Sequence, residues 1–173
     1  MNRLETVHAT DSLMTVQVEA DPGAFIAEVL PLLPDHYMEL SVHKFHGFEL
    51  HPDFNVYKRK AETGELLAVS LRKDAEVVGY FFGFIGPALH YVDCLTLSMD
   101  IMYVTKQARG SKGRRHAASM LFDCVEQEAR RRGVHQIRVG SKIHRGRHTA
   151  ALYEMRGYGA EETYWSKWLG AGS

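Results

Sequence analysis

The sequence predicts a mixed α/β protein, and three observations carry this prediction. Apolar residues between Phe25 and Leu33 recur at helical spacing behind Asp21-Pro22-Gly23, which is a helix-start signal. Two runs of strand-forming residues, Leu66–Arg72 and Val77–Ile85, flank a short polar turn, and a third run follows at Leu95–Val104. A basic, glycine-containing segment then leads into a second amphipathic helix.

The other elements follow from turn and breaker residues. Pro31 and Pro34 are expected to disturb and end the first helix, and Gly86-Pro87 is expected to break the chain after the second strand. Residues 36–60 are expected to mix short helical pieces with loop. The second helix has an apolar stripe, formed by Ala117, Met120, Leu121, Cys124, Val125 and Ala129, and ends at Gly133. Three more elements are predicted: a strand at Gln136–Val139, a short helix at His148–Met155 and a last strand at Thr163–Leu169.

Length and composition restrict the class of protein. A chain of 173 residues with 45% hydrophobic content is expected to form one globular domain, residues 1–173, and is not a disordered chain. No apolar run approaches the roughly 18 to 20 residues of a membrane-spanning helix, so no membrane partner is expected. The N-terminus lacks a basic-then-apolar secretory signal, and two cysteines make a poor disulfide framework. We therefore expect a cytoplasmic protein.

The net charge of zero hides an asymmetry between the two parts of the chain. Residues 1–100 carry 7 Lys and Arg against 15 Asp and Glu, while residues 101–173 carry 14 against 6. The two parts could pair with each other across the fold. The basic part could instead face a polyanion, such as the phosphates of a cofactor or a nucleic acid.

The strongest chemical signal is the segment Tyr103-Val-Thr-Lys-Gln-Ala-Arg109-Gly-Ser-Lys-Gly-Arg114. Its glycine spacing fits neither the P-loop nor the dinucleotide fingerprint. It resembles the acyl-CoA pyrophosphate loop of the GCN5-related N-acetyltransferases, in which glycines admit the phosphates to backbone N–H groups and cations neutralise them. Lys106 stands where the family usually has proline, and Gly113 lies one residue beyond the usual glycine.

Three further blocks resemble the same family and occur in its order. They are Val77–Tyr80, Glu126–Ile137 and His148–Tyr158, and the likeness spans about residues 62–169, roughly 60% of the chain. Pro87–Tyr91 further resembles a bacteriophage-associated branch of the superfamily. A phage-encoded member would act in the cytoplasm of the host.

The resemblance implies a fold and a reaction. The fold is a central, mostly antiparallel sheet flanked by helices, whose middle strands, about Met99–Val104 and Gln136–Ser141, splay apart to admit a pantetheine arm. The reaction is direct attack by a primary amine on the co-substrate acetyl-CoA, without an acyl-enzyme. Two groups of residues would bind acetyl-CoA: the backbone of Met102, Tyr103 and Val104 at the pantetheine arm, and Arg109, Gly110, Ser111, Lys112, Gly113 and Arg114 at the pyrophosphate.

The same resemblance implies catalytic candidates. Tyr153 matches the general acid that protonates the departing thiolate. For the general base we consider Asp100, whose even spacing from Met102 and Val104 predicts that it shares their face of the strand, and His90, whose unperturbed pKa suits the role. Glu39 is a third candidate. Glu39 and Tyr91 are also expected to contact the acceptor.

Several other motifs have ordinary explanations. His43, His46 and His51 have no cysteine beside them, so we expect no metal site. The run Arg130–Arg132 suits a solvated helix end or a nucleic-acid contact. Tyr164, Trp165 and Trp168 suit core packing or an interface, so a homodimer stays open.

Two other functions stay open beside the acetyltransferase. One is an inactive binding module that contacts nucleic acid or a protein partner. The other is an acyl-CoA-dependent enzyme that modifies a nucleobase. The amine acceptor of an acetyltransferase could itself be a small molecule, a protein or a nucleobase.

Overall fold

The computed structural model describes residues 14–109, 114–142 and 146–169. Contacts between residues group the chain into two compact units, residues 1–140 and residues 141–173. We call them the first unit and the second unit. The expectation of one domain over the whole chain stays a prediction.

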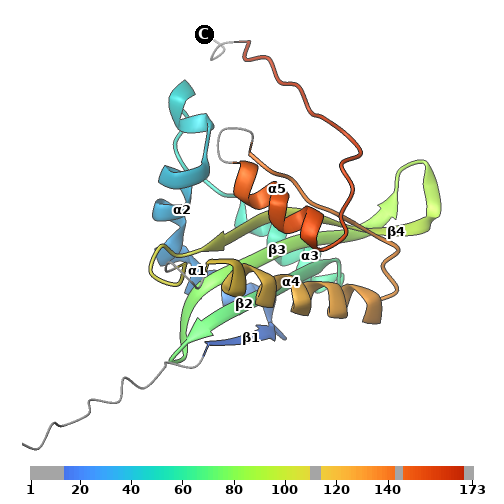
Figure 1. Ribbon diagram of the computed structural model, residues 1–173, viewed down its shortest axis with the longest axis horizontal. Coiled ribbons are helices and arrows are strands. Elements are labelled where there is room, and N and C mark those ends of the chain that lie inside the picture. Colours follow the sequence, from blue (N-terminus) through green and yellow to red (C-terminus); the bar gives the residue numbers. More distant parts are fainter. Residues whose placement is uncertain (1–13, 110–113, 143–145, 170–173) are drawn as a thin grey trace, which may run out of the picture. The chain divides into compact units, whose positions relative to one another are not determined.

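The first unit is built on a five-stranded sheet, confirming the mixed α/β class (Figure 1). Its strands lie side by side in chain order: β1 (Met14–Val18), β2 (Leu66–Lys73), β3 (Glu76–Ala88), β4 (Tyr91–Val104) and β5 (Gln136–Arg138). The first four are antiparallel to their neighbours, and β5 is parallel to β4. The sheet is therefore mostly antiparallel. The parallel pair needs a crossover, which the long helix α4 (Arg114–Arg131) supplies.

Helices cover both faces of the sheet. One face carries α1 (Pro22–Val29) and α3 (Phe54–Glu62), and the chain between them forms η1 (Leu30–Leu32), α2 (Leu33–Leu40) and η2 (His43–His46). The other face carries α4 (Figure 1). The predicted mixture of short helical pieces and loop after His36 is confirmed.

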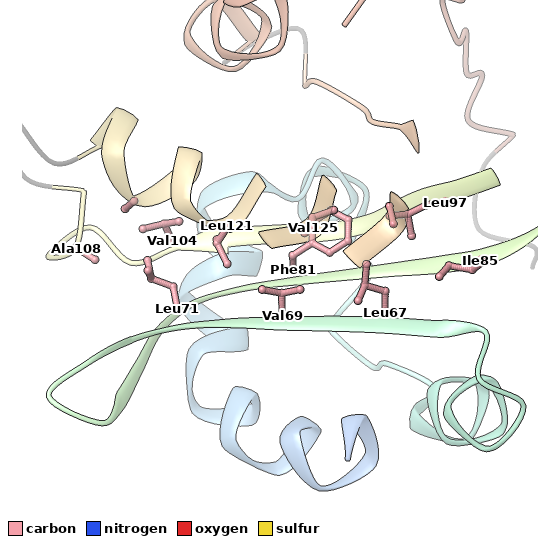
Figure 2. Close-up of a cluster of buried hydrophobic side chains, with 12 residues drawn as sticks. Leu67, Val69, Leu71, Phe81, Ile85, Leu97, Val104, Ala108, Leu121 and Val125 are labelled. Atoms are coloured by element: carbon pink, nitrogen blue, oxygen red, sulfur yellow. The ribbon is translucent and has the colours of Figure 1, made fainter. Parts of the chain in front are cut away.

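The alternation of residues along the strands creates two cores. Leu67, Val69 and Leu71 of β2 point to one face and pack against the α4 stripe that includes Leu121 and Val125 (Figure 2). Their neighbours point to the other face, where they meet α1 and α3 in a second cluster: Leu66, Ala68, Tyr80, Phe82 and Tyr103 from the sheet with Phe25, Ile26 and Val29 from α1. Because both faces are covered, Leu66–Leu71 of β2 and Gly79–Gly83 of β3 are buried on both sides of the sheet.

The two early prolines act differently from the sequence prediction. α1 does end at Val29, before Pro31. Pro31 and Pro34, however, each stand in the first turn of a new element, so the chain stays helical as far as Leu40. A proline at the start of a helix removes an N–H group that has no intrahelical acceptor, which is why neither residue stops the helical path.

The prediction that Gly86-Pro87 breaks the chain is wrong, because β3 continues to Ala88. The Ile85 N–H donates toward β2, to the Glu65 carbonyl at 2.7 Å. The nitrogen of Pro87, two residues on, faces the same way but lies beyond the start of β2, where no strand would accept a hydrogen bond. Proline is therefore tolerated in this strand.

The second unit contains α5 (Gly146–Met155), which confirms the predicted short helix. The helix is followed by Gly157, whose φ of +82° is the left-handed conformation that glycine adopts readily. The strand predicted at Thr163–Leu169 is wrong, since residues 158–169 form neither helix nor strand. Alternating residues fit a strand only when another strand offers hydrogen bonds, and none within the described ranges pairs with this segment.

Near its middle, β4 contains one extra residue opposite β3. Phe82 and Gly83 are consecutive on β3, but their partners on β4 are Ile101 and Met99, so Asp100 is the bulged residue. Gly83 is needed at this point, because a Cβ there would lie 2.8 Å from Leu97 Cδ1 and 2.9 Å from Phe81 Cε1. Both of these side chains are fully buried and have no room to move aside.

We expect Gly83→Ala to destabilise the protein by about 1 to 3 kcal/mol, since an added methyl group overpacks the core. Urea unfolding measures the change. Gly86→Ala on the same strand is the control, because a Cβ at Gly86 meets no atom within 4 Å. Equal stability of the two variants would contradict the account of the bulge.

Candidate active site

β4 and β5 pair over only three residues. The parallel ladder joins Thr96, Leu97 and Ser98 to Gln136, Ile137 and Arg138, and β5 then ends. β4 runs on to Val104 and pairs there with β3 on its other side. Within the described residues no strand pairs with the far side of Met99–Val104, which we call the open edge of β4. The predicted splay of the two middle strands is thus present.

The hydrogen-bond pattern shows which groups face the open edge. Thr105 N donates to Val78 O at 2.8 Å, so Thr105 directs its backbone groups toward β3. In an antiparallel pair this direction alternates from residue to residue. Met102 and Val104 therefore direct their N–H and C=O groups away from β3, toward the open edge. The family resemblance assigned the backbone of Met102, Tyr103 and Val104 to a pantetheine arm. Tyr103 directs its backbone groups toward β3 and does not face the open edge.

Asp100 points to a different face from the one that its spacing predicted. The bulge breaks the alternation, so Met102 and Val104 pack toward α4, whereas Asp100 accepts a hydrogen bond from the Tyr57 hydroxyl of α3 on the opposite face. The expectation of a shared face is therefore wrong. The carboxylate remains exposed, two residues from the outward-facing groups of Met102.

Arg109 and Glu39 form a buried ion pair at the end of β4. Both guanidinium Nη atoms donate to the two carboxylate oxygens of Glu39, whose side chain is 5% exposed. This bidentate contact raises the pKa of Arg109. It ties α2 to the start of the basic segment. The cofactor-binding role of Arg109 stays a prediction, and its guanidinium already has a partner in Glu39.

An aromatic stack lies beside this pair. The His36 ring stacks on the Tyr103 ring, with 4.7 Å between the ring centroids. The Arg109 guanidinium carbon lies over the same ring, 5.4 Å from its centroid. His36 Nδ1 lies 2.6 Å from the Tyr80 hydroxyl. Burial raises the pKa of Tyr103. Sequence reasoning missed His36, although it lies three residues before Glu39 and so on the same helix face.

His90 and Tyr91 lie far from the open edge. His90 belongs to the turn between β3 and β4, and Tyr91 is the first residue of β4. Ten residues of strand separate His90 from Asp100, which is roughly 30 Å at the usual rise per residue. The structure therefore does not bring His90 together with Asp100 or Met102.

Tyr153 lies on α5 in the second unit. Its side chain is 7% exposed, and its ring centroid lies 5.8 Å from that of Tyr158. Burial raises the pKa of Tyr153 to about 12, so the phenol stays protonated at neutral pH. A proton donor must hold its proton until the leaving group needs it. The catalytic role of Tyr153 stays a prediction.

The basic segment itself is described only in part. Gly110, Ser111, Lys112 and Gly113 lie outside the described residues, and Arg114 is the first residue of α4. Farther along α4, Glu128 accepts hydrogen bonds from Arg131 and Arg132, which lower the pKa of Glu128 to about 2. Two cations of the arginine run thus stabilise the helix end.

The described residues contain neither a metal-binding cluster nor a membrane-spanning helix. Across residues 14–109, 114–142 and 146–169, no group of three or more His, Cys, Asp or Glu side chains is arranged to hold a metal ion. His43 and His46 belong to η2, and His51 lies in the exposed loop before α3. No helix in these ranges is long and apolar enough to cross a bilayer.

Comparison with known proteins shows which fold this chain has. No family model matches the sequence, and no curated protein matches it significantly. Solved structures do match. An aminoglycoside acetyltransferase from an uncultured soil metagenomic sample has a TM-score of 0.68 at 18% identity, covering 91% of this chain and 99% of that one. The ribosomal-protein-alanine N-acetyltransferase of Brucella melitensis biovar Abortus 2308 has a TM-score of 0.65 at 18% identity, covering 91% and 100%.

A third match is a predicted acetyltransferase from Clostridium acetobutylicum that was solved with acetyl-CoA. Its TM-score is 0.60 at 17% identity, and the match covers 91% of this chain and 97% of that one. This chain has the fold of the GCN5-related N-acetyltransferases. The open edge of β4 agrees with the splayed strands that the family resemblance implied at this position. The resemblance to a phage-associated branch stays a prediction.

The Glu39–Arg109 pair gives a testable prediction. Removing one partner leaves a buried charge without its counterion, so we expect Glu39→Met or Arg109→Met to lower the free energy of unfolding by about 3 to 5 kcal/mol. The double variant, which removes both charges, is expected to lose less than the sum of the two. Urea unfolding of the three variants measures this coupling. Additive losses would show that the contact contributes nothing to stability.

Proposed function

We propose that this protein is an N-acetyltransferase that transfers an acetyl group from acetyl-CoA to a primary amine by direct attack. The open edge of β4 carries this proposal. Its outward N–H and C=O groups at Met102 and Val104 fit the amide groups of a pantetheine arm, which would bind as an added strand. The fold, shared with solved acetyltransferases, supports the same function.

Acetyl-CoA would supply the activated acetyl group and a thiolate leaving group. In the proposal, the outward backbone groups of Met102 and Val104 hold the arm, and one of their N–H groups donates a hydrogen bond to the oxygen on which negative charge develops. The segment from Gly110 to Arg114 binds the pyrophosphate at the start of α4, because a helix N-terminus presents N–H groups and a positive dipole end to an anion.

Asp100 is the general base in this proposal. Three observations favour it over His90 and Glu39: Asp100 is exposed beside the open edge, His90 lies at the distant hairpin turn, and both carboxylate oxygens of Glu39 are engaged by Arg109. Asp100 lies about 6 to 7 Å along the strand from Met102. One bound amine, or an amine with one water, would span that interval.

Binding of acetyl-CoA, followed by calorimetry, is the first test. We expect saturable binding and, with a panel of primary amines that includes aminoglycosides and peptides, release of free thiol. Arg114→Glu should weaken acetyl-CoA binding about 10- to 100-fold, as loss of a charge-assisted hydrogen bond typically does. Arg130→Glu is the matched control, since this exposed arginine lies at the far end of α4. Absence of saturable binding at millimolar acetyl-CoA would refute the proposal and leave the binding module.

Tyr153 is the general acid in this proposal. Tyr153→Phe keeps the ring and removes the proton, so we expect unchanged affinity for acetyl-CoA and a single-turnover rate lower by about 10²- to 10⁴-fold. A single-turnover measurement isolates the chemical step from product release. Tyr158→Phe, which alters the neighbouring ring, is the control. A wild-type rate in Tyr153→Phe would mean that another group protonates the thiolate.

A further inference from the structure

Tyr57 connects helix α3 to the bulge of β4. Its hydroxyl donates to Asp100 Oδ2, although 43 residues separate the two in the sequence. Tyr57 and Asp100 are the two ends of one contact between the helical layer and the strand that bears the open edge. No motif in the sequence singled out Tyr57.

The Tyr57 ring is fixed by other aromatic rings. It meets Phe82 edge-on at a centroid distance of 5.7 Å, lies 5.6 Å from Phe84, and has Phe54 6.5 Å away on its own helix. Such offset and edge-to-face contacts hold a ring in one orientation. The direction of the hydroxyl is therefore set by packing and does not depend on a substrate.

The Tyr57 hydroxyl is also held in its neutral form. Burial, the hydrogen bond to Asp100 and the negative charge of that carboxylate all raise the pKa of Tyr57 well above that of a free tyrosine. A neutral phenol donates one hydrogen bond, and here the donation goes to Oδ2. The other oxygen, Oδ1, makes no hydrogen bond to any described residue.

We propose that Tyr57 is a positioning residue, which fixes the Asp100 carboxylate so that Oδ1 faces the acceptor ammonium group. This inference rests on the proposed acetyltransferase function and deepens it. Asp100 takes one proton from the ammonium group and becomes a neutral carboxyl group, and the amine nitrogen then forms its bond to the acetyl carbon. The carbon–sulfur bond breaks, the CoA thiolate leaves with a proton from Tyr153, and the nitrogen gives up its second proton, which restores the phenol. Tyr57 keeps its own proton throughout.

The test is a double-mutant cycle on the intact protein. Tyr57→Phe keeps the ring among its aromatic neighbours and removes the hydroxyl. We expect kcat for the amine to fall about 10- to 100-fold, the usual effect of losing a hydrogen bond to a charged group, while calorimetric affinity for acetyl-CoA is unchanged. In an Asp100→Asn background the same change should cost less than about twofold, because the group that Tyr57 positions is already absent.

Tyr37→Phe is the matched control. It removes a tyrosine hydroxyl that donates to the Phe48 carbonyl and has no contact with Asp100 in the structure, so kcat should stay at the wild-type value. Thermal unfolding checks that every variant is folded.

Each outcome decides the proposal. A Tyr57→Phe variant with the kcat of the wild-type protein would overturn the positioning role, and so would a loss of kcat that is additive with the loss in Asp100→Asn. In either case, acetylation of an amine by the wild-type protein leaves the acetyltransferase proposal standing. A wild-type protein that acetylates none of the amines overturns the proposed function, and the role of Tyr57 with it.

Discussion

The parting of β4 from β5 after Ser98 is the constraint on which the candidate site depends. The backbone groups of a strand in the middle of a sheet normally form hydrogen bonds with a neighbouring strand on each side. β4 does so only as far as Ser98, and the bulge at Asp100 follows at once. The bulge bends the strand and re-aims its side chains, so one extra residue explains the turned carboxylate. The end of β5 at Arg138 leaves the backbone of Met102 and Val104 without a strand partner on that side among the described residues.

Ion pairs join the layers around this strand. Arg109, at the end of β4, is paired with Glu39 of α2, and Arg72 of β2 contacts both Glu19 and Glu28 at 3.1 and 2.7 Å. Each arginine also lies over an aromatic ring, Tyr103 or Phe25. Such pairs require defined geometry, because a buried charge without its partner is costly.

Most of the fold could be predicted from the sequence, because period-two and period-3.6 patterns report burial directly. The strands at Leu66–Arg72 and Leu95–Val104 and the stripe of α4 are examples. The predictions for the prolines and for the segment Thr163–Leu169 were wrong, because the structure at these positions depends on which neighbouring groups are available for hydrogen bonding. At the site, the family resemblance indicated Met102 and Val104. The bulge could not be predicted, because it depends on how β4 pairs with β3. The contacts of Tyr57 with Asp100 and of Glu39 with Arg109 could not be predicted either, because they join residues that are 43 and 70 positions apart in the sequence.

The open edge of β4 has a consequence for the behaviour of the protein in solution. Its sequence, Met99-Asp-Ile-Met-Tyr-Val104, is apolar and strand-forming, and unpaired N–H and C=O groups beside such residues are a template for β-pairing between molecules. The bulge distorts this template, and the Asp100 carboxylate places a charge within it. The residue assigned to proton transfer would thus also act as a gatekeeper that keeps two copies of the chain from joining into a continuous sheet.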